Sequence, residues 1–445
     1  MLKRKVETEI QKWLAYDRRA LLIDGARQVG KTYSVRHCMA LSGVDLLEIN
    51  LLESPESLRA LKNARSIQDL TVNLSAATGR ELIPGRTVIF IDEVQEYVEI
   101  VTMIKFWVDD GSYRFILSGS LLGVELKNLR SAPVGYVHEI KMYPLDFEEF
   151  LTASGITETV LDHLRHSFEG KKPVGPTVHE KMMQHFHRYL VVGGMPQAVQ
   201  EYIDTGNINK VNEIQRDILS FYKRDFTRYE ADGKSLMLTA IFDQIPSQLL
   251  KQNRRFNYAD IKHGLRFERL ENSFLWLYKA GVVLPAFNCT EPKLALKLNE
   301  KSSLVKLYYS DVGLLTYSCG ASMRKDILFG GLETNLGGVM ENAVIQELCA
   351  HDTSVYYYNS KKQGELDFVI ELNGSVLPIE VKSGKDYYVH SAIQNVLNNP
   401  GLGIKEAVVF TGYDVSVSDR ITYYPVYMCT FLKENRDMPV LAPVE

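Results

Sequence analysis

The sequence has few cysteines and no long hydrophobic run. Five cysteines in 445 residues are spread singly, without the paired spacing of a zinc site or the density of a disulfide framework. No stretch approaches the length of a membrane-spanning segment, and the charged N-terminus lacks the apolar core of a signal peptide. We therefore expect reduced thiols and a cytoplasmic protein with no membrane partner.

The chain also lacks an excess of charge of either sign. With 51 Lys and Arg against 55 Asp and Glu, its net charge is -4, so any attraction to nucleic acid must come from a local patch. Hydrophobic residues make up 45% and charged residues 24%, which is typical of globular proteins. A chain of this length exceeds one hydrophobic core, so we expect several domains.

Short apolar runs bounded by turns alternate with longer mixed segments over the first 150 residues, which predicts an α/β fold with a parallel sheet covered on both faces. Helical periodicity follows, then helices with short β-like runs, then a helix and four strands. We therefore predict a P-loop core, a helical lid, a winged helix-turn-helix and a separate α/β unit. Their predicted ranges are 1–150, 151–230, 231–318 and 319–445.

A complete nucleotide-binding loop follows the first apolar run. GARQVGKT at 25–32 matches G-x-x-x-x-G-K-[ST], a pattern expected by chance in roughly one chain in a hundred of this length. Backbone N–H groups surround the phosphates in such a loop, Lys31 reaches the terminal phosphates, and Thr32 ligates Mg²⁺. The sequence thus predicts ATP and Mg²⁺ as cofactors. The predicted nucleotide contacts are Gly25, Ala26, Arg27, Gln28, Val29, Gly30, Lys31, Thr32 and the adjacent Tyr33.

An acidic pair ends the apolar run TVIFIDE at 87–93. Asp92 is placed to hold Mg²⁺, and Glu93 to polarise the attacking water, because phosphoryl transfer depends mainly on positioning and charge stabilisation. Lys31 and Glu93 are therefore candidate catalytic residues. The alternative is a surface acidic pair that merely follows a core strand.

Polar residues also follow the next apolar run, RFILSGS. Ser118 and Ser120 are candidates for sensing the γ-phosphate, although serines also commonly cap turns. Arg130, in the polar segment beyond, is a candidate catalytic cation acting in cis or from a neighbouring subunit. A solvated arginine is the alternative.

These motifs in this order, followed by PLDFEEF at 144–150 and GGMP at 193–196, resemble a widespread prokaryotic family of AAA-type ATP-binding proteins. The family is related to the STAND and archaeal ATPase clade and carries a C-terminal domain of uncharacterised function. FYKRDF at 221–226 and PVYM at 425–428 fit the same pattern. The resemblance implies that Gly194 and Pro196 approach the adenine. The sensor turn departs from many AAA-type enzymes, which carry asparagine there.

Carboxylates gather in the C-terminal strands. Asp367 lies in GELDFVIE, and Glu380 and Lys382 follow in VLPIEVK, where the period of a strand places both on one face. Two carboxylates, a metal-activated water and a lysine make a phosphodiesterase constellation. The pattern resembles the PD-(D/E)xK restriction-endonuclease-like superfamily.

That resemblance implies a Mg²⁺ or Mn²⁺ site made by Asp367, Glu380 and an upstream helical glutamate, with Lys382 catalytic. Glu341 in GVMENAVIQEL is the matching position, and Glu347 is the weaker candidate. The alternative is a structural remnant with a solvated Lys-Glu strand face.

A basic patch precedes the C-terminal unit, with few acids among its members. Phosphate oxygens would attract such a patch, and a helix at 266–279 would then read a DNA groove; a solvated face is the alternative. The patch consists of Lys251, Arg254, Arg255, Lys262, Arg266 and Arg269.

Together these features favour an ATPase whose nucleotide state controls a nuclease-like domain that acts on or binds DNA. A nucleotide-dependent signalling or scaffolding switch with an inert C-terminal domain is the chief alternative. A DNA-binding regulator that uses only its winged helix is the third.

Overall fold

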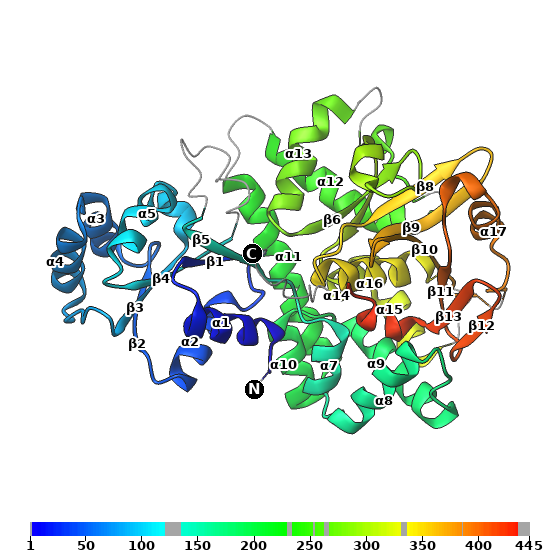
Figure 1. The fold of residues 1–445 in the computed structure, drawn as a ribbon, viewed down its shortest axis with the longest axis horizontal. Helices are drawn as coiled ribbons and strands as arrows, with labels where there is room; N and C mark the ends of the chain where they lie inside the picture. The colour runs from blue at the N-terminus through cyan, green and yellow to red at the C-terminus, as the bar shows by residue number, and fades with distance from the viewer. Residues whose placement is uncertain are drawn as a thin grey trace, which may run out of the picture.

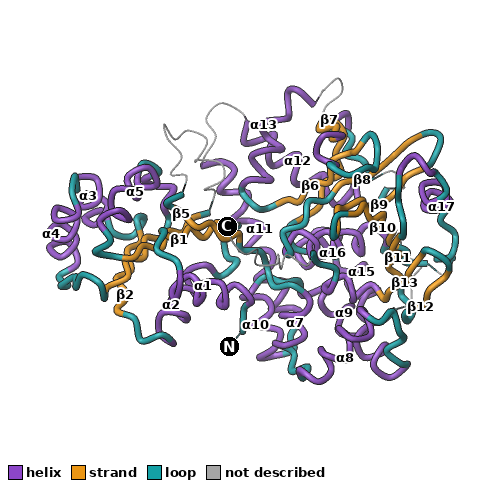
Figure 2. The backbone as a smooth tube through the Cα atoms, in the orientation of Figure 1, coloured by secondary structure: helices purple, strands orange, loops and turns teal. Residues whose placement is uncertain are grey.

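The computed structural model describes residues 2–120, 135–228, 234–251, 254–261, 267–330, 336–384 and 386–434. Figure 1 shows two sheets at opposite sides of the molecule, with α10 and α11 between them, and Figure 2 shows the strands gathered in these two groups. No helix in these ranges has both the length and the apolar character needed to cross a membrane.

The first sheet is parallel throughout, with strand order β2-β3-β4-β1-β5. Its two faces are covered by different helices. In β1, Leu21 and Ile23 join a core with α1 and α2, whereas Ala20 and Leu22 join a second core with α3, α4 and α5. Alternate side chains of the strand therefore pack into the helix layers on the two faces of the sheet. This confirms the parallel α/β sheet predicted from the apolar runs. The bounds are α1 (Lys5–Tyr16), β1 (Ala20–Asp24), α2 (Lys31–Leu41), β2 (Asp45–Asn50), α3 (Pro55–Asn63), α4 (Ile67–Thr78), β3 (Thr87–Asp92), η1 (Val94–Tyr97), α5 (Ile100–Asp110), β4 (Arg114–Gly119) and β5 (Val137–Lys141).

Five helices follow the first sheet, as the helical periodicity predicts. Their apolar faces are buried against the C-terminal half: α9 packs on α14 and α15, and α8 packs on η6. The Tyr424 hydroxyl, for example, donates to the Phe168 carbonyl at 2.9 Å. These helices therefore join the two sheets. They are α7 (Phe147–Ala153), α8 (Glu158–Glu169), α9 (Pro176–Val192), α10 (Pro196–Thr205) and α11 (Ile208–Arg228).

The second sheet is mixed, with order β12-β13-β11-β10-β9-β8-β6-β7. Helix α16 shares a core with β9 through Phe368 and Ile370, and α17 covers the opposite face with Leu366 and Val369. The strands are β6 (Val283–Cys289), β7 (Glu300–Tyr309), β8 (Tyr356–Ser360), β9 (Gly364–Leu372), β10 (Ser375–Val381), β11 (Ala407–Thr411), β12 (Ser416–Ser418) and β13 (Ile421–Pro425). The helices are α12 (Lys234–Leu249), η3 (Tyr258–Asp260), α13 (Phe267–Lys279), η4 (Leu296–Asn299), α14 (Val312–Cys319), α15 (Ala321–Phe329), α16 (Gly337–Ala350), α17 (Ser391–Leu397), η5 (Pro400–Leu402) and η6 (Val426–Phe431).

The predicted boundary at residue 318 does not separate two sheets. Strands β6 and β7 form an antiparallel pair, as a wing would, but β6 also pairs in parallel with β8, where Phe287 lies opposite Tyr356. The physical reason is that an unpaired β8 edge would leave its backbone N–H and C=O groups without partners. Residues 283–309 therefore belong to the C-terminal sheet, which corrects their assignment to a separate winged-helix unit.

Candidate functional site

The nucleotide-binding loop joins β1 to α2, which begins at Lys31. A side chain at Gly25 would place its Cβ only 2.3 Å from the Met142 carbonyl oxygen, so only glycine fits. Gly30 has φ 97° at the N-cap of α2, and Gln28 has φ 68°, both in the left-handed region. These left-handed residues shape the loop before the N-terminus of α2, and helix N-termini that follow such loops are typical anion-binding sites.

Lys31 lies over this loop and is only 7% exposed. Its Nζ donates to the carbonyl oxygens of Gly25 at 2.8 Å and Ala26 at 2.9 Å. Burial lowers the pKa of Lys31, while the nearby carboxylates of Glu93, Asp24 and Asp92 favour its charged form. The ammonium is thus held inside the loop, where it would meet phosphate oxygens.

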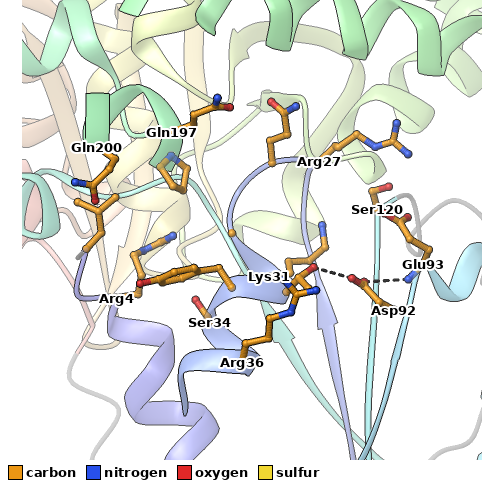
Figure 3. Close-up of a pocket in the computed structure, with 16 residues that line it drawn as sticks. Arg4, Arg27, Lys31, Ser34, Arg36, Asp92, Glu93, Ser120, Gln197 and Gln200 are labelled. Atoms are coloured by element: carbon orange, nitrogen blue, oxygen red, sulfur yellow. Dashed lines mark hydrogen bonds between the residues drawn. The ribbon is translucent and has the colours of Figure 1, made fainter. Parts of the chain in front are cut away.

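Asp92 is the centre of a polar group at the ends of β3 and β4 (Figure 3). Thr32 Oγ1 donates to Asp92 Oδ2 at 2.6 Å, and the Ser118 hydroxyl and the Glu93 amide both donate to Oδ1. A hydroxyl and a carboxylate lie side by side, which is the donor set expected for Mg²⁺ beside a triphosphate. Thr32 and Asp92 are therefore brought together as predicted.

Of the two serines predicted to sense the γ-phosphate, only Ser120 lines the nucleotide cavity. Ser118 is fully buried and holds Asp92, whereas Ser120 lines the nucleotide cavity. The Ser120 hydroxyl is buried and makes no hydrogen bond within the described part of the chain. Ser120 is therefore better placed than Ser118 to meet a phosphate. Arg130 lies outside the described residues.

Glu93 has φ 58°, in the left-handed region that non-glycine residues rarely adopt. It lines the cavity, and its carboxylate accepts a hydrogen bond from the Gln95 amide. Strained backbone of this kind costs on the order of 1–3 kcal/mol and is concentrated at functional sites. The turn points Glu93 into the cavity while Asp92 stays on the strand.

A cavity of about 510 Å³ opens over the loop and takes lining residues from three parts of the chain. Gln28, Gly30 and Tyr33, predicted as nucleotide contacts, line it together with Lys31, Thr32, Asp92 and Glu93. Six lining residues escaped the sequence analysis because no motif contains them: Leu2, Arg4, Ser34, Arg36, Gln197 and Gln200. Arg4 is 6% exposed and donates to the Val29 carbonyl at 2.9 Å, so an N-terminal residue supports the loop. Gly25, Ala26 and Val29 shape the loop without lining this cavity.

Of the two residues expected near the adenine, only Pro196 lines the cavity. Gly194 instead lies against the Leu145 backbone, where an added Cβ would be 2.1 Å from the carbonyl oxygen. The Gly194 amide donates to Asp311 Oδ2 at 2.5 Å, and its carbonyl accepts from the Leu145 amide at 2.7 Å. Gly194 thus joins Leu145 of the ATPase domain to the segment before α14, and its approach to the adenine stays a prediction.

Gly194→Ala is expected to lower the free energy of unfolding by about 1–3 kcal/mol, because the new methyl group overlaps backbone atoms that cannot move independently. Gly412→Ala is the matched control, since a Cβ there meets no atom within 4 Å. Thermal unfolding of both variants measures the difference. Equal midpoints for the two variants would contradict the packing role.

Arg27 links the loop to helix α11. Its Nη1 lies 2.8 Å from Asp225 Oδ1, and the Tyr222 hydroxyl donates to the Arg27 carbonyl at 3.2 Å. Both partners belong to FYKRDF. A Cβ on Gly281, in the turn after α13, would lie 3.0 Å from the Ala26 amide nitrogen. The nucleotide loop is therefore contacted by two elements that pack on the C-terminal half.

The C-terminal carboxylates lie near one another but do not form an open metal site. Lys382 Nζ is 2.7 Å from Glu380 Oε2, and Asp367 Oδ2 accepts from the Val381 amide at 2.9 Å. Burial, with Asp367 nearby, raises the pKa of Glu380 to about 7. Glu341 is fully buried and accepts from the Tyr308 hydroxyl at 2.9 Å.

An arginine stands between two of these carboxylates. The Arg254 guanidinium pairs with Glu341 and lies 3.8 Å from Asp367 Oδ1. Over the described ranges, Glu341, Asp367 and Glu380 do not bring three ligand atoms within 4.8 Å of one another. No local pattern predicts this contact, because Arg254 and Glu341 are 87 residues apart along the chain.

Two residues of the predicted basic patch form ion pairs with carboxylates. Lys251 pairs with Asp260, and Arg254 with Glu341, so neither ammonium nor guanidinium is free for phosphate. Helix α13, predicted as a groove reader, buries Leu270 and Leu277. Lys262 and Arg266 lie outside the described residues, as does the side chain of Arg269.

Comparison with known proteins identifies three regions. An AAA domain family matches residues 17–151, and two domains of unknown function, DUF8612 and DUF4143, match 183–325 and 336–428. The chain matches none of the curated proteins. Among solved structures it is similar to the Walker-type ATPase of Pyrococcus abyssi, at 15% identity and TM-score 0.44, over 72% of this chain and 96% of that chain. The AAA match spans the loop, Asp92 and Glu93, and it supports ATP hydrolysis by residues 17–151.

Proposed function

We propose that the AAA-type ATPase domain of residues 17–151 uses Mg²⁺ and ATP to control the C-terminal unit, and that this unit is a nuclease-like module acting on DNA. One observation supports control of the C-terminal unit by the nucleotide. The loop that would hold the phosphates is contacted by α11 and by the turn after α13. A change in the loop on ATP binding or hydrolysis is therefore transmitted to both elements.

The path from the loop to the second sheet is a chain of packed side chains. Phe226, beside Asp225 on α11, meets Phe242 of α12 and Trp276 of α13 edge-on, with ring centroids 5.5 Å apart in each pair. Helix α12 packs on β7, and α13 packs on β6. Because packed interiors transmit strain, this path supports coupling between the nucleotide loop and the edge of the C-terminal sheet.

The carboxylate cluster supports nuclease-like chemistry in its residue types. Glu380 and Asp367 offer oxygen ligands for Mg²⁺ or Mn²⁺, and Lys382 stands beside Glu380, where it would stabilise a developing phosphorane charge. A divalent ion held by Glu341 and Asp367 would have to displace Arg254. Withdrawal of Arg254 is therefore part of the proposed activation, and DNA is its proposed substrate.

The same arginine favours the second candidate function. A guanidinium paired with Glu341 supplies positive charge where the metal would lie, so the C-terminal unit would be catalytically inert. The chain would then act as a nucleotide-dependent signalling or scaffolding switch. The two functions differ in what happens when Arg254 is removed.

Metal-dependent DNA cleavage is expected to be lost by at least about 100-fold in Glu380→Ala and Asp367→Ala, with ATP hydrolysis unchanged, because only the distant metal ligands are removed. Arg254→Ala is expected to raise cleavage, and Lys172→Ala, at an exposed residue outside the basic patch and both sites, is its control. The assay uses single- and double-stranded DNA with Mg²⁺ or Mn²⁺, with and without ATP. Absence of cleavage by both the wild type and Arg254→Ala would favour the switch.

A further inference from the structure

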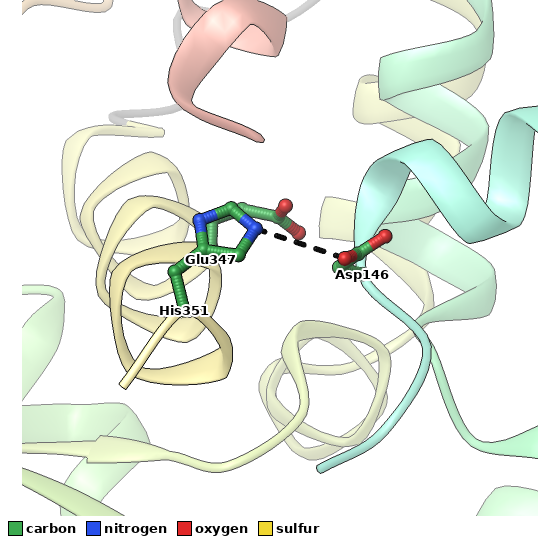
Figure 4. Close-up of side chains that lie close together, drawn as sticks. All are labelled: Asp146, Glu347 and His351. Atoms are coloured by element: carbon green, nitrogen blue, oxygen red, sulfur yellow. Dashed lines mark ion pairs between the residues drawn. The ribbon is translucent and has the colours of Figure 1, made fainter. Parts of the chain in front are cut away.

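A separate group of ligating side chains lies where the start of α7 meets the end of α16. Asp146 is the N-cap of α7, Glu347 lies in the last turns of α16, and His351 follows that helix (Figure 4). Each residue offers one ligand atom, and these atoms all lie within 4.8 Å of one another. The group thus combines one residue of the ATPase domain with two of the C-terminal unit.

Buried atoms in this group lack hydrogen-bond partners. The His351 side chain is 8% exposed, and neither ring nitrogen makes a hydrogen bond to any described residue; Nε2 is 3.7 Å from Asp146 Oδ2. Glu347 is fully buried, and only Oε1 is satisfied, by the Phe147 amide at 2.9 Å and the Tyr189 hydroxyl at 3.0 Å. Leaving a buried polar group unsatisfied destabilises the folded state. Several such atoms at one place point to a missing ligand.

The nearest ammonium group, that of Lys5, does not neutralise all three carboxylates around it. Lys5 Nζ pairs with Asp146 at 2.6 Å and with Glu148 at 2.5 Å, but makes no direct ion pair with Glu347 in the described structure. Glu347 Oε2 is buried and has no hydrogen-bond partner among the described residues. A buried carboxylate oxygen of this kind is stabilised by a positive ion.

We propose that Asp146, Glu347 and His351 bind a divalent first-row transition metal, such as Zn²⁺ or Co²⁺, that fastens the ATPase domain to α16. One imidazole with two carboxylates suits these ions better than Mg²⁺ or Ca²⁺, which prefer oxygen ligands alone. A cavity of about 310 Å³ lined by Asp146 and His351 gives the ion an entry path and room for coordinated water. Lys5, whose side chain is 42% exposed, remains paired with Glu148 when the metal binds Asp146.

Cobalt titration of the full-length protein without nucleotide tests this site. One Co²⁺ per chain is expected, with visible d–d absorption that Zn²⁺ displaces. His351→Ala and Glu347→Gln are expected to weaken binding by about 100-fold, because each loses one of three ligands. His390→Ala is the matched control, since this buried histidine bonds the Tyr423 hydroxyl in another part of the fold. All titrations use a Glu380→Ala background, which removes the C-terminal carboxylate cluster as a source of signal.

The absence of saturable Co²⁺ absorption in that background, or its persistence in both ligand variants, would overturn the site. Lys5→Met provides a test that does not depend on the folding of the ligand variants. It removes the ammonium that competes for Asp146 Oδ2 and is expected to tighten Co²⁺ binding several-fold, whereas unchanged or weaker binding would contradict the proposal. DNA cleavage and ATP hydrolysis do not enter either measurement.

Discussion

Lys31→Ala is expected to abolish measurable ATP binding and to reduce ATP hydrolysis to background. The side chain is 7% exposed and is fixed within the loop by two carbonyl oxygens, so its ammonium is positioned before any phosphate arrives. Removing a preorganised cation from a phosphoryl-transfer site costs roughly 10²–10³-fold in rate, before the loss of binding is added. Alanine also leaves the carboxylates of Asp92, Asp24 and Glu93 facing the triphosphate without this compensating charge.

Calorimetric titration with ATP and Mg²⁺ measures the binding, and phosphate release measures the turnover. Lys172→Ala is a suitable control, because Lys172 is exposed in the loop between α8 and α9 and does not line the nucleotide cavity. If Lys31→Ala binds ATP with the affinity of the wild type, then the loop does not hold the phosphates, and the assignment of the cavity fails with it.

Glu93→Gln is expected to separate binding from hydrolysis. Glutamine keeps the size and hydrogen-bonding reach of glutamate, so ATP affinity should stay within a few-fold of the wild type. Hydrolysis should fall by about 10²–10⁴-fold, which is the usual contribution of a general base. The left-handed turn at Glu93 directs this side chain into the cavity, while Asp92 remains bonded to Thr32 and Ser118.

Single-turnover hydrolysis with saturating ATP and Mg²⁺ is the direct measurement, since it does not depend on product release. Glu96→Gln, three residues later in η1, is the control for a change of charge near the site. Comparable rates for Glu93→Gln and the wild type would show that another group orients the water. Ser120, which lines the same cavity, would then be the next residue to substitute.

The sequence alone determined the parts of this protein that depend on neighbouring residues. GARQVGKT makes its loop from contiguous amides and one lysine, and TVIFIDE carries Asp92 and Glu93 to a strand end that parallel pairing places beside that loop. The continuous apolar runs also predicted a sheet covered on both faces, and every side chain of β1 and β3 is indeed buried. Local chemistry and strand periodicity suffice for these conclusions.

The tertiary structure alone decided which distant elements meet. The pattern of a short strand does not say which sheet it joins, so β6 and β7 were read as a wing and are instead the edge of the C-terminal sheet. Gly194 lies in a motif and Arg254 in a basic patch, but Asp311 and Glu341, to which they bond, lie more than 80 residues away along the chain. Packing between remote segments fixed their roles, because burial forces each polar group and each backbone atom to find a partner that no local pattern specifies.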